Sequence, residues 1–406
     1  MNRLREYRER HGWSQEEVIA EIHRRALQRG DPVAPGLDQP ALSRHENGHK
    51  RPGPRNRDLY CLVYGATPAE LGFCLALPDQ ERNHEDVDRR GFLAGAAGLA
   101  ASLALPDLPA PTRLGEGDIA RLRHTVSHLY KLDDLHGAGS VYALATRTFN
   151  RLRSLTERAS YNPATGQAIR ELAALTAEHA GWLAFDAGQH DEARRWWLES
   201  MHWARLANAD SVSVMTMASM SIQASDQGYA REAINLATAA QRSAKASATP
   251  RLTSVLLARE ALGHAGDGNA TSARSALRRA RGFVDQTHDD DPSWITVSWP
   301  ANFASNECRV ALTLGDTVAA QEAARTALAL NDPLAYPRNH AVYMIQLADV
   351  LARRRKIDES AAVATRAAVA AADLDSGRVT RGLRAVAKRL EPHRGNADVG
   401  AFLALY

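Results

Sequence analysis

The stretch DQPALSRHENG, residues 38–48, decides the fold of the first part of this chain of 406 residues. Asp38 can accept hydrogen bonds from the free N–H groups at a helix start, and Pro40 fits the first turn of that helix. The glycine at the end of the stretch suits a left-handed stop. Upstream, Ser14 and Glu17 have the spacing of a capping box, which opens an earlier helix. The sequence therefore predicts two helices joined by a connecting segment.

The second of these helices carries side chains that can recognise the edges of DNA bases. Gln39 can pair with adenine through two hydrogen bonds, and Arg44 can do the same with guanine. Ser43 lies between them and can reach a base or a phosphate. Gln15, in the first turn of the preceding helix, is placed to contact phosphate. These four residues predict a surface that binds duplex DNA.

The local charge agrees with this prediction. Residues 43–57 carry five basic side chains against one acidic side chain, although the whole chain has a net charge of only +3. Such a basic stretch beside a recognition helix is typical of DNA binding, because it attracts the phosphate backbone. A solvated surface charge run is the alternative.

Two motifs and one longer ending resemble a known family. The motifs LREYRERHGWSQEE, residues 4–17, and LSRHENGHKRP, residues 42–52, resemble the helix-turn-helix domain of the phage-repressor-like XRE/Cro family. The ending YCLVYGATPAELGF, residues 60–73, is similar to the version that actinobacteria fuse to a helical-repeat domain. The resemblance implies a five-helix DNA-binding domain over residues 1–76.

The resemblance also implies roles for individual residues, with double-stranded DNA as the partner. Base recognition falls on Gln39, Pro40, Ser43 and Arg44. Phosphate contacts fall on Gln15, Lys50, Arg51 and Arg55. Residues 28–37 depart from the family, because they are longer than its usual tight turn, and the register of the recognition helix stays open.

The composition predicts an all-α protein with two or three domains. The chain has three cysteines and no C-x-x-C pair, which argues against a disulfide framework and against a cysteine zinc site. A reduced, cytoplasmic location is therefore expected. No phosphate-binding glycine loop, nucleophile elbow or paired catalytic carboxylates occur, so we expect neither enzyme activity nor a cofactor.

The segment RRGFLAGAAGLAASLALP, residues 89–106, is similar to a twin-arginine export signal. Its place after a DNA-binding domain argues against export, and its apolar run is too short to span a bilayer. We therefore interpret residues 77–115 as a linker, with prolines near its end, and expect no membrane association.

Five similar phrases recur between residues 188 and 361. They are GQHDEA (188–193), GYAREA (228–233), GNATSA (268–273), GDTVAA (315–320) and KIDESA (356–361). Their final alanines are 40, 40, 47 and 41 residues apart, and each phrase joins two apolar helical stretches. The pattern resembles tetratricopeptide repeats over residues 165–375, although the usual period is about 34 residues. It predicts a tetratricopeptide-like α-solenoid over residues 116–406.

Such arrays bind peptides, small molecules or proteins on a concave face, so the solenoid is predicted to hold an effector. Polar residues spaced to share that face are the candidates: Asn302, Asn306, Arg309, Asn339 and Tyr343. Asparagine side chains can hold a peptide backbone through paired donors and acceptors. Ordinary solvent-facing polar positions are the alternative.

Aromatic and metal-ligating residues suggest further sites. A cluster around Trp196 and Trp197 predicts packing between repeats, with a ligand pocket as the alternative. Trp294 and Trp299 are expected in an irregular loop. His124 and His128, four residues apart, lack a third metal ligand, and the run HDDD, residues 288–291, lacks the glycine and the distal glutamate of a calcium loop. We expect no metal site.

Two functional interpretations follow. In the first, the protein is a sequence-specific transcriptional regulator that binds DNA as a homodimer, with a repeat domain that mediates dimerisation and binds the effector. In the second, it is an interaction scaffold or adaptor with a non-specific or vestigial DNA-binding domain. The set of Gln39, Ser43 and Arg44 favours the first.

Overall fold

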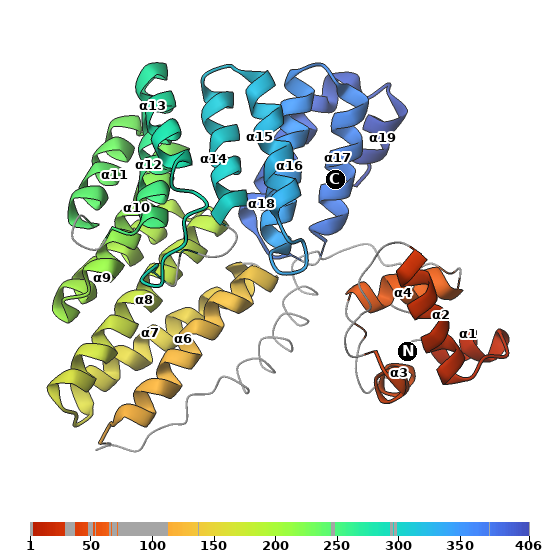
Figure 1. Ribbon diagram of the computed structural model, residues 1–406, viewed down its shortest axis with the longest axis horizontal. Coiled ribbons are helices and arrows are strands. Elements are labelled where there is room, and N and C mark those ends of the chain that lie inside the picture. The colour runs from red at the N-terminus through yellow and green to blue at the C-terminus, as the bar shows by residue number, and fades with distance from the viewer. Residues whose placement is uncertain are drawn as a thin grey trace, which may run out of the picture. The chain divides into compact units, whose positions relative to one another are not determined.

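Figure 1 shows the computed structural model of the chain. The structure describes residues 3–28, 37–47, 52, 54–64, 66, 71, 113–136, 138–244, 248–292, 295, 299–372 and 374–405. These residues form helices and their connections, with one isolated bridge between Arg113 and Ser160, so the all-α prediction is confirmed. The contacts divide the chain into two compact units, Met1–Asp88 and Arg89–Tyr406. The predicted boundaries at residues 76 and 115 stay predictions, since residues 77–112 lie outside the described part.

The described residues of the first unit form four helices, and the predicted fifth helix is not among them. The four are α1 (Leu4–Arg10), α2 (Gln15–Gln28), α3 (Gln39–Glu46) and α4 (Pro54–Tyr64). All four contribute buried side chains to one core: Leu4, Val18, Ile22, Leu42 and Tyr60. This core gives α3 a fixed place in the unit.

The capping residues start α2 and α3 where the sequence predicts. The Ser14 N–H donates to Glu17 Oε2 at 2.6 Å, and the Glu17 N–H donates to Ser14 Oγ at 3.2 Å, which completes the capping box. Asp38 Oδ1 accepts the Ala41 N–H at 2.8 Å, with Pro40 in the first turn. The predicted start of α3 is therefore confirmed.

The second unit is a stack of antiparallel helix pairs (Figure 1). Its helices are α6 (Glu116–His136), α7 (Ala138–Arg158), α8 (Pro163–Ala187), α9 (His190–Ala207), α10 (Asp210–Asp226), α11 (Ala230–Ala244), α12 (Pro250–Gly266), α13 (Ala270–Arg281), α14 (Trp299–Thr313), α15 (Thr317–Leu330), α16 (Pro337–Arg353), α17 (Ile357–Ala370), α18 (Gly377–Leu390), the short η1 (Glu391–His393) and α19 (Ala397–Leu403). The predicted turns join α8 to α9 and each later pair through α16 and α17. None of the described helices combines the length and apolar character needed to cross a membrane.

A small residue is fully buried in the first turn of each second helix from α9 to α15. These residues are Ala193, Ala233, Ala273 and Ala320, each with no exposed surface. A small side chain here allows the two helices of a pair to approach closely. Each turn also holds a residue with positive φ two positions before the helix, and in these four pairs that residue is glycine.

The fifth pair differs from the predicted register by one residue. Arg355, with φ of 62°, takes the place of the turn glycine, and Ser360 takes the place of the buried alanine. Ser360 Oγ donates to the carbonyl oxygen of Ala348 at 2.7 Å, which satisfies the hydroxyl inside the pair. The structural interval from Ala320 is therefore 40 residues, and the phrase begins at Arg355, not at Lys356.

The single interval of 47 residues contains the long connection between α13 and α14, residues 282–298. Trp299 begins α14 and is not part of this loop, which corrects the sequence prediction. It is 4% exposed, and its Nε1–H donates to Ser254 Oγ at 3.2 Å. Trp294 lies outside the described residues.

The adjacent tryptophans of α9 pack between helices. Trp197 is fully buried, and its Nε1–H donates to the carbonyl oxygen of Glu178 at 3.2 Å. Trp196 is partly buried and meets Phe149 edge to face, with 5.1 Å between the ring centroids. The structure supports packing between repeats, the first of the two alternatives.

The buried alanines lead to a prediction about stability. Ala320→Leu should lower the free energy of unfolding by about 1–3 kcal/mol, because a larger side chain overpacks the contact between α14 and α15. Ala319→Leu is the matched control, since Ala319 is the exposed neighbour on the same helix. It should change the stability by less than about 0.5 kcal/mol. Urea denaturation followed by circular dichroism measures both, and equal stability of the two variants would contradict the packing argument.

Candidate functional site

Helix α3 presents to solvent the residues that the sequence predicts to contact bases. Gln39, Pro40 and Arg44 are exposed, and Ser43 is partly buried. Asn47 Nδ2–H donates to the Ser43 carbonyl oxygen at 2.8 Å and to its Oγ at 3.3 Å. Among the described residues, Arg44 has no hydrogen bond or ion pair, so its guanidinium group is available to a ligand.

A buried carboxylate anchors α3 to the two preceding helices. Glu46, at the end of α3, is 7% exposed, and its Oε1 accepts from Arg8 Nε of α1 at 2.6 Å. Its Oε2 accepts from Gln15 Nε2 of α2 at 2.8 Å. A charged pair that is buried and has further hydrogen bonds is costly to break. Gln15, for which the sequence predicts a phosphate contact, therefore helps to position α3.

The other predicted phosphate contacts fall beyond what the structure describes. Lys50 and Arg51 lie outside the described residues. Arg55 lies in the first turn of α4, but its side chain is not described. These three assignments stay predictions from the sequence.

Four of the five predicted effector residues lie on two neighbouring first helices and take part in bonds within the unit. Tyr343 of α16, 2% exposed, donates from its hydroxyl group to Asn302 Oδ1 at 2.9 Å. Asn306, 5% exposed, donates from Nδ2 to the Asn302 carbonyl oxygen at 2.9 Å. Arg309 pairs with Asp226 at the end of α10. These contacts bring α10, α14 and α16 together at one place.

Asn339 is partly buried in the first turn of α16, and no hydrogen bond of its side chain to the other four predicted effector residues is found among the described contacts. It lies one helical turn before Tyr343. Direct bonds therefore join three of the five predicted residues, Asn302, Asn306 and Tyr343, while Arg309 pairs with Asp226 instead.

Sequence reasoning missed Arg259 of α12, which joins this group. Its Nη1–H donates to Asn306 Oδ1 at 3.3 Å, and its Nε is buried without a partner in the described structure. Burial, and then the neighbouring charge of Arg309, lowers the pKa of Arg259 to about 10. The group stays charged at neutral pH.

A signal for Arg259 is present in the sequence, because the repeat interval applies to the first helices as well as to the turns. Stepping by 40, 40, 47 and 40 residues from His179 gives one row of polar residues. The row consists of His179, Ser219, Arg259, Asn306 and Gln346. The residue beside Asn306 in this row is Arg259, as the hydrogen bond confirms.

Two ion-pair clusters connect helices that are distant in the sequence. Arg338 of α16 is 4% exposed, pairs with Asp133 of α6 and lies 3.5 Å from Asp134. Burial raises the pKa of Asp134 to about 6. These pairs join the first helix of the unit to a helix near its end, which requires the array to curve back on itself.

The second cluster surrounds Asp186 of α8, which is fully buried. Arg378 of α18 approaches its Oδ1 to 3.2 Å and lies over the ring of Trp182, 5.5 Å from the centroid. Ser376 Oγ donates to Asp186 Oδ2 at 2.6 Å. The end of α8 is thus held against the start of α18.

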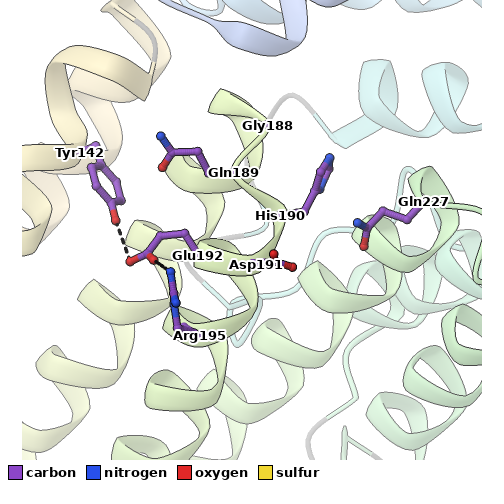
Figure 2. A pocket seen from close by; sticks show the side chains of 8 residues that line it. All are labelled: Tyr142, Gly188, Gln189, His190, Asp191, Glu192, Arg195 and Gln227. Atoms are coloured by element: carbon purple, nitrogen blue, oxygen red, sulfur yellow. Dashed lines mark hydrogen bonds and ion pairs between the residues drawn. The ribbon is translucent and has the colours of Figure 1, made fainter.

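An open, shallow pocket with a volume of about 620 Å³ lies beside the turn between α8 and α9. Figure 2 shows the side chains that line it. Its lining is largely polar: Tyr142, Gly188, Gln189, His190, Asp191, Glu192, Arg195 and Gln227. Tyr142 donates to Glu192 Oε1 at 3.2 Å, and Glu192 also pairs with Arg195. Some of the polar side chains in this pocket thus bond to one another. None of these residues was predicted from the sequence as a binding site.

Among the described residues, no group of three or more side chains is arranged to hold a metal ion. His124 and His128 stack with their ring centroids 6.0 Å apart. Asp291 Oδ2 accepts the backbone N–H of His288 at 3.0 Å, which closes a turn. These residues therefore have local structural contacts of their own.

Comparison with known proteins gives similarity to solved structures only. No family model matches the sequence, and no curated protein matches it. The chain is similar to the crystal structure of NprR in complex with its cognate peptide NprX, with a TM-score of 0.48 and 14% sequence identity. The match covers 79% of this chain and 88% of that chain. A similarity of this size supports no conclusion about what this chain binds.

A buried carboxyl group leads to a prediction about pH. Glu178 of α8 is 4% exposed, and burial raises its pKa from 4.5 to about 7, although Ser219 Oγ donates to it at 2.6 Å. Between these two pH values the unfolded chain loses the proton and the folded chain keeps it, so stability falls as the pH rises. Glu178→Gln removes this titration. The difference in unfolding free energy, variant minus wild type, should therefore increase by up to about 3 kcal/mol as the pH rises from 4.5 to 7.

Denaturation of both proteins at a series of pH values tests this prediction. The neighbouring His179, whose pKa burial lowers to about 4, is present in both proteins and cancels in the difference. Glu157→Gln, at an exposed position of α7, is the control and should give a constant difference. A constant difference for Glu178→Gln as well would show that the carboxyl group is not held neutral.

Proposed function

We propose that this protein is a sequence-specific, DNA-binding transcriptional regulator that acts in the cytoplasm. The observation that carries the proposal is the recognition helix α3, which exposes Gln39 and Arg44 while Glu46 anchors its other end. Side chains with fixed positions on a rigid helix can form bidentate hydrogen bonds to base edges. The XRE/Cro-like motifs of the sequence support the same function.

The second unit supplies the regulatory part of the proposal. Its first helices carry a row of polar residues, and the group around Asn302, Asn306 and Arg309 includes charged and neutral donors. Repeat arrays commonly bind peptides, small molecules or proteins on such surfaces. We propose that an effector binds here and changes the affinity for DNA, with a coupling free energy of about 1–3 kcal/mol.

Arg44 gives the direct test of DNA reading. Arg44→Ala should weaken binding by about 1–3 kcal/mol to the duplex that wild type selects from a randomised pool, because a bidentate contact to guanine is lost. Preference should relax at one base pair only. Arg279→Ala removes the same charge at an exposed position of α13 and should leave the affinity unchanged.

Binding isotherms over single-base variants of the selected duplex provide the measurement. If wild type and Arg44→Ala show the same sequence preference, Arg44 does not read a base. If no duplex is enriched at all, the adaptor with a non-specific DNA-binding domain becomes the better interpretation.

We further propose that the protein binds DNA as a homodimer through its repeat unit. One recognition helix contacts few base pairs, and a symmetric dimer doubles the site by reading two half-sites about 34 Å apart, or a multiple of that distance. Light scattering should show two chains on a duplex with two half-sites. A single chain on that duplex, at concentrations that saturate it, would refute the dimer.

A further inference from the structure

The guanidinium group of Arg259 differs from its charged neighbours because no carboxylate among the described residues forms a hydrogen bond or ion pair with it. Arg259 extends from the first helix α12 and is partly buried, so solvent still reaches part of it. Its hydrogen bond in the described structure goes to a neutral amide, Asn306 Oδ1, at 3.3 Å. Its Nε has no partner among the described residues.

The neighbouring arginines have their own carboxylates. Arg309 pairs with Asp226, and Arg378 lies 3.2 Å from Asp186. Both arginines are close enough to Arg259 to act on its charge. Asp226 also acts on Arg259, but it already pairs with Arg309, so Arg259 is left without a carboxylate of its own in the described structure.

An uncompensated charge in a largely buried place destabilises a folded protein, because the surroundings replace its hydration poorly. Such groups cluster at functional sites, where a bound ligand can supply the opposite charge. Arginine presents several N–H donors in a planar fork, which matches the two oxygens of a carboxylate. The site offers one arginine without a bonded carboxylate, which one carboxylate group matches, whereas a doubly charged phosphate would have to draw Arg309 or Arg378 from its partner.

We propose that Arg259 binds a carboxylate group of the effector, with the amide of Asn306 beside it. Asn306 can rotate its amide so that an N–H group also faces the carboxylate. This inference rests on the proposed function, because it names the chemical group by which the repeat unit holds its effector. Three sources share this chemistry: a peptide C-terminus, an acidic side chain and a small free acid.

The first arm of the test measures stability of the full-length protein without any carboxylate ligand. Arg259→Gln should raise the melting temperature, by about 1–3 °C, because the uncompensated charge is removed. Arg279→Gln, the same change on the exposed face of α13, should leave it unchanged. A lower melting temperature for Arg259→Gln would show that the charge serves the fold, and this result overturns the proposal.

The second arm measures binding of sodium acetate at constant ionic strength, with sodium chloride as the reference salt. Acetate should raise the melting temperature of the wild-type protein, and the NMR signal of acetate should broaden when the protein is added. The affinity of Arg259→Gln for acetate should be lower by a factor of about ten or more. Arg259→Lys keeps the charge without the planar fork and should retain a reduced response. If Arg259→Gln fails to fold, Arg259→Lys replaces it in the binding measurement.

Three further probes distinguish the sources of the carboxylate. Trialanine with a free C-terminus represents a peptide end, trialanine amide is its control, and N-acetylaspartate amide represents an acidic side chain. Binding of either carboxylate peptide supports that source, and binding of acetate alone supports a small acid. Equal responses of wild type and Arg259→Gln, or no response of either, overturn the proposal.

DNA binding measured on the same preparations separates this inference from the proposed function. If wild type binds acetate through Arg259 but selects no duplex, the regulator proposal fails and the carboxylate site stands. If wild type selects a duplex but no probe depends on Arg259, the carboxylate site fails and the regulator proposal stands.

Discussion

A small, fully buried residue in the first turn of each second helix is the constraint on which the repeat unit depends. Ala193, Ala233, Ala273, Ala320 and Ser360 occupy this position in five successive pairs. Two helices can approach closely only where the side chain between them is small. A larger side chain would push the helices apart, because the densely packed interior has no empty space to hold it. Since every pair has the same constraint, every pair adopts nearly the same geometry. Equivalent residues of the first helices therefore come into line along the stack.

That alignment explains why polar residues from distant segments meet. The row from His179 to Gln346 keeps its order across the interval of 47 residues, because the long connection between α13 and α14 accommodates the difference. Arg259 consequently faces Asn306, although they are 47 residues apart. Stacked repeats place equivalent residues side by side, so a row of this kind is built one residue per repeat.

Local signals in the sequence were sufficient for helix starts and turns, and insufficient for contacts that depend on curvature. Asp38 and the Ser14–Glu17 pair act within one helical turn, so their spacing alone predicted them correctly. The fifth turn was misaligned by one residue, because Arg355 adopts the left-handed conformation that glycine marks in the other four pairs. The pair Arg338 and Asp133 joins residues 205 positions apart. Its formation depends on small rotations summed over the whole stack, which no local pattern reveals.

The ion pairs of Arg309 and Arg378 indicate how a ligand at Arg259 would affect the repeat array. Arg309 ties α14 to the end of α10, and Arg378 ties α18 to the end of α8. A negative charge at Arg259 attracts both arginines and competes with Asp226 and Asp186 for them. Each of these carboxylates joins helices from different repeats, so a change in pairing shifts one repeat against another. An effector can shift such an equilibrium only by its difference in affinity for the two arrangements, and the competition for shared arginines provides that difference.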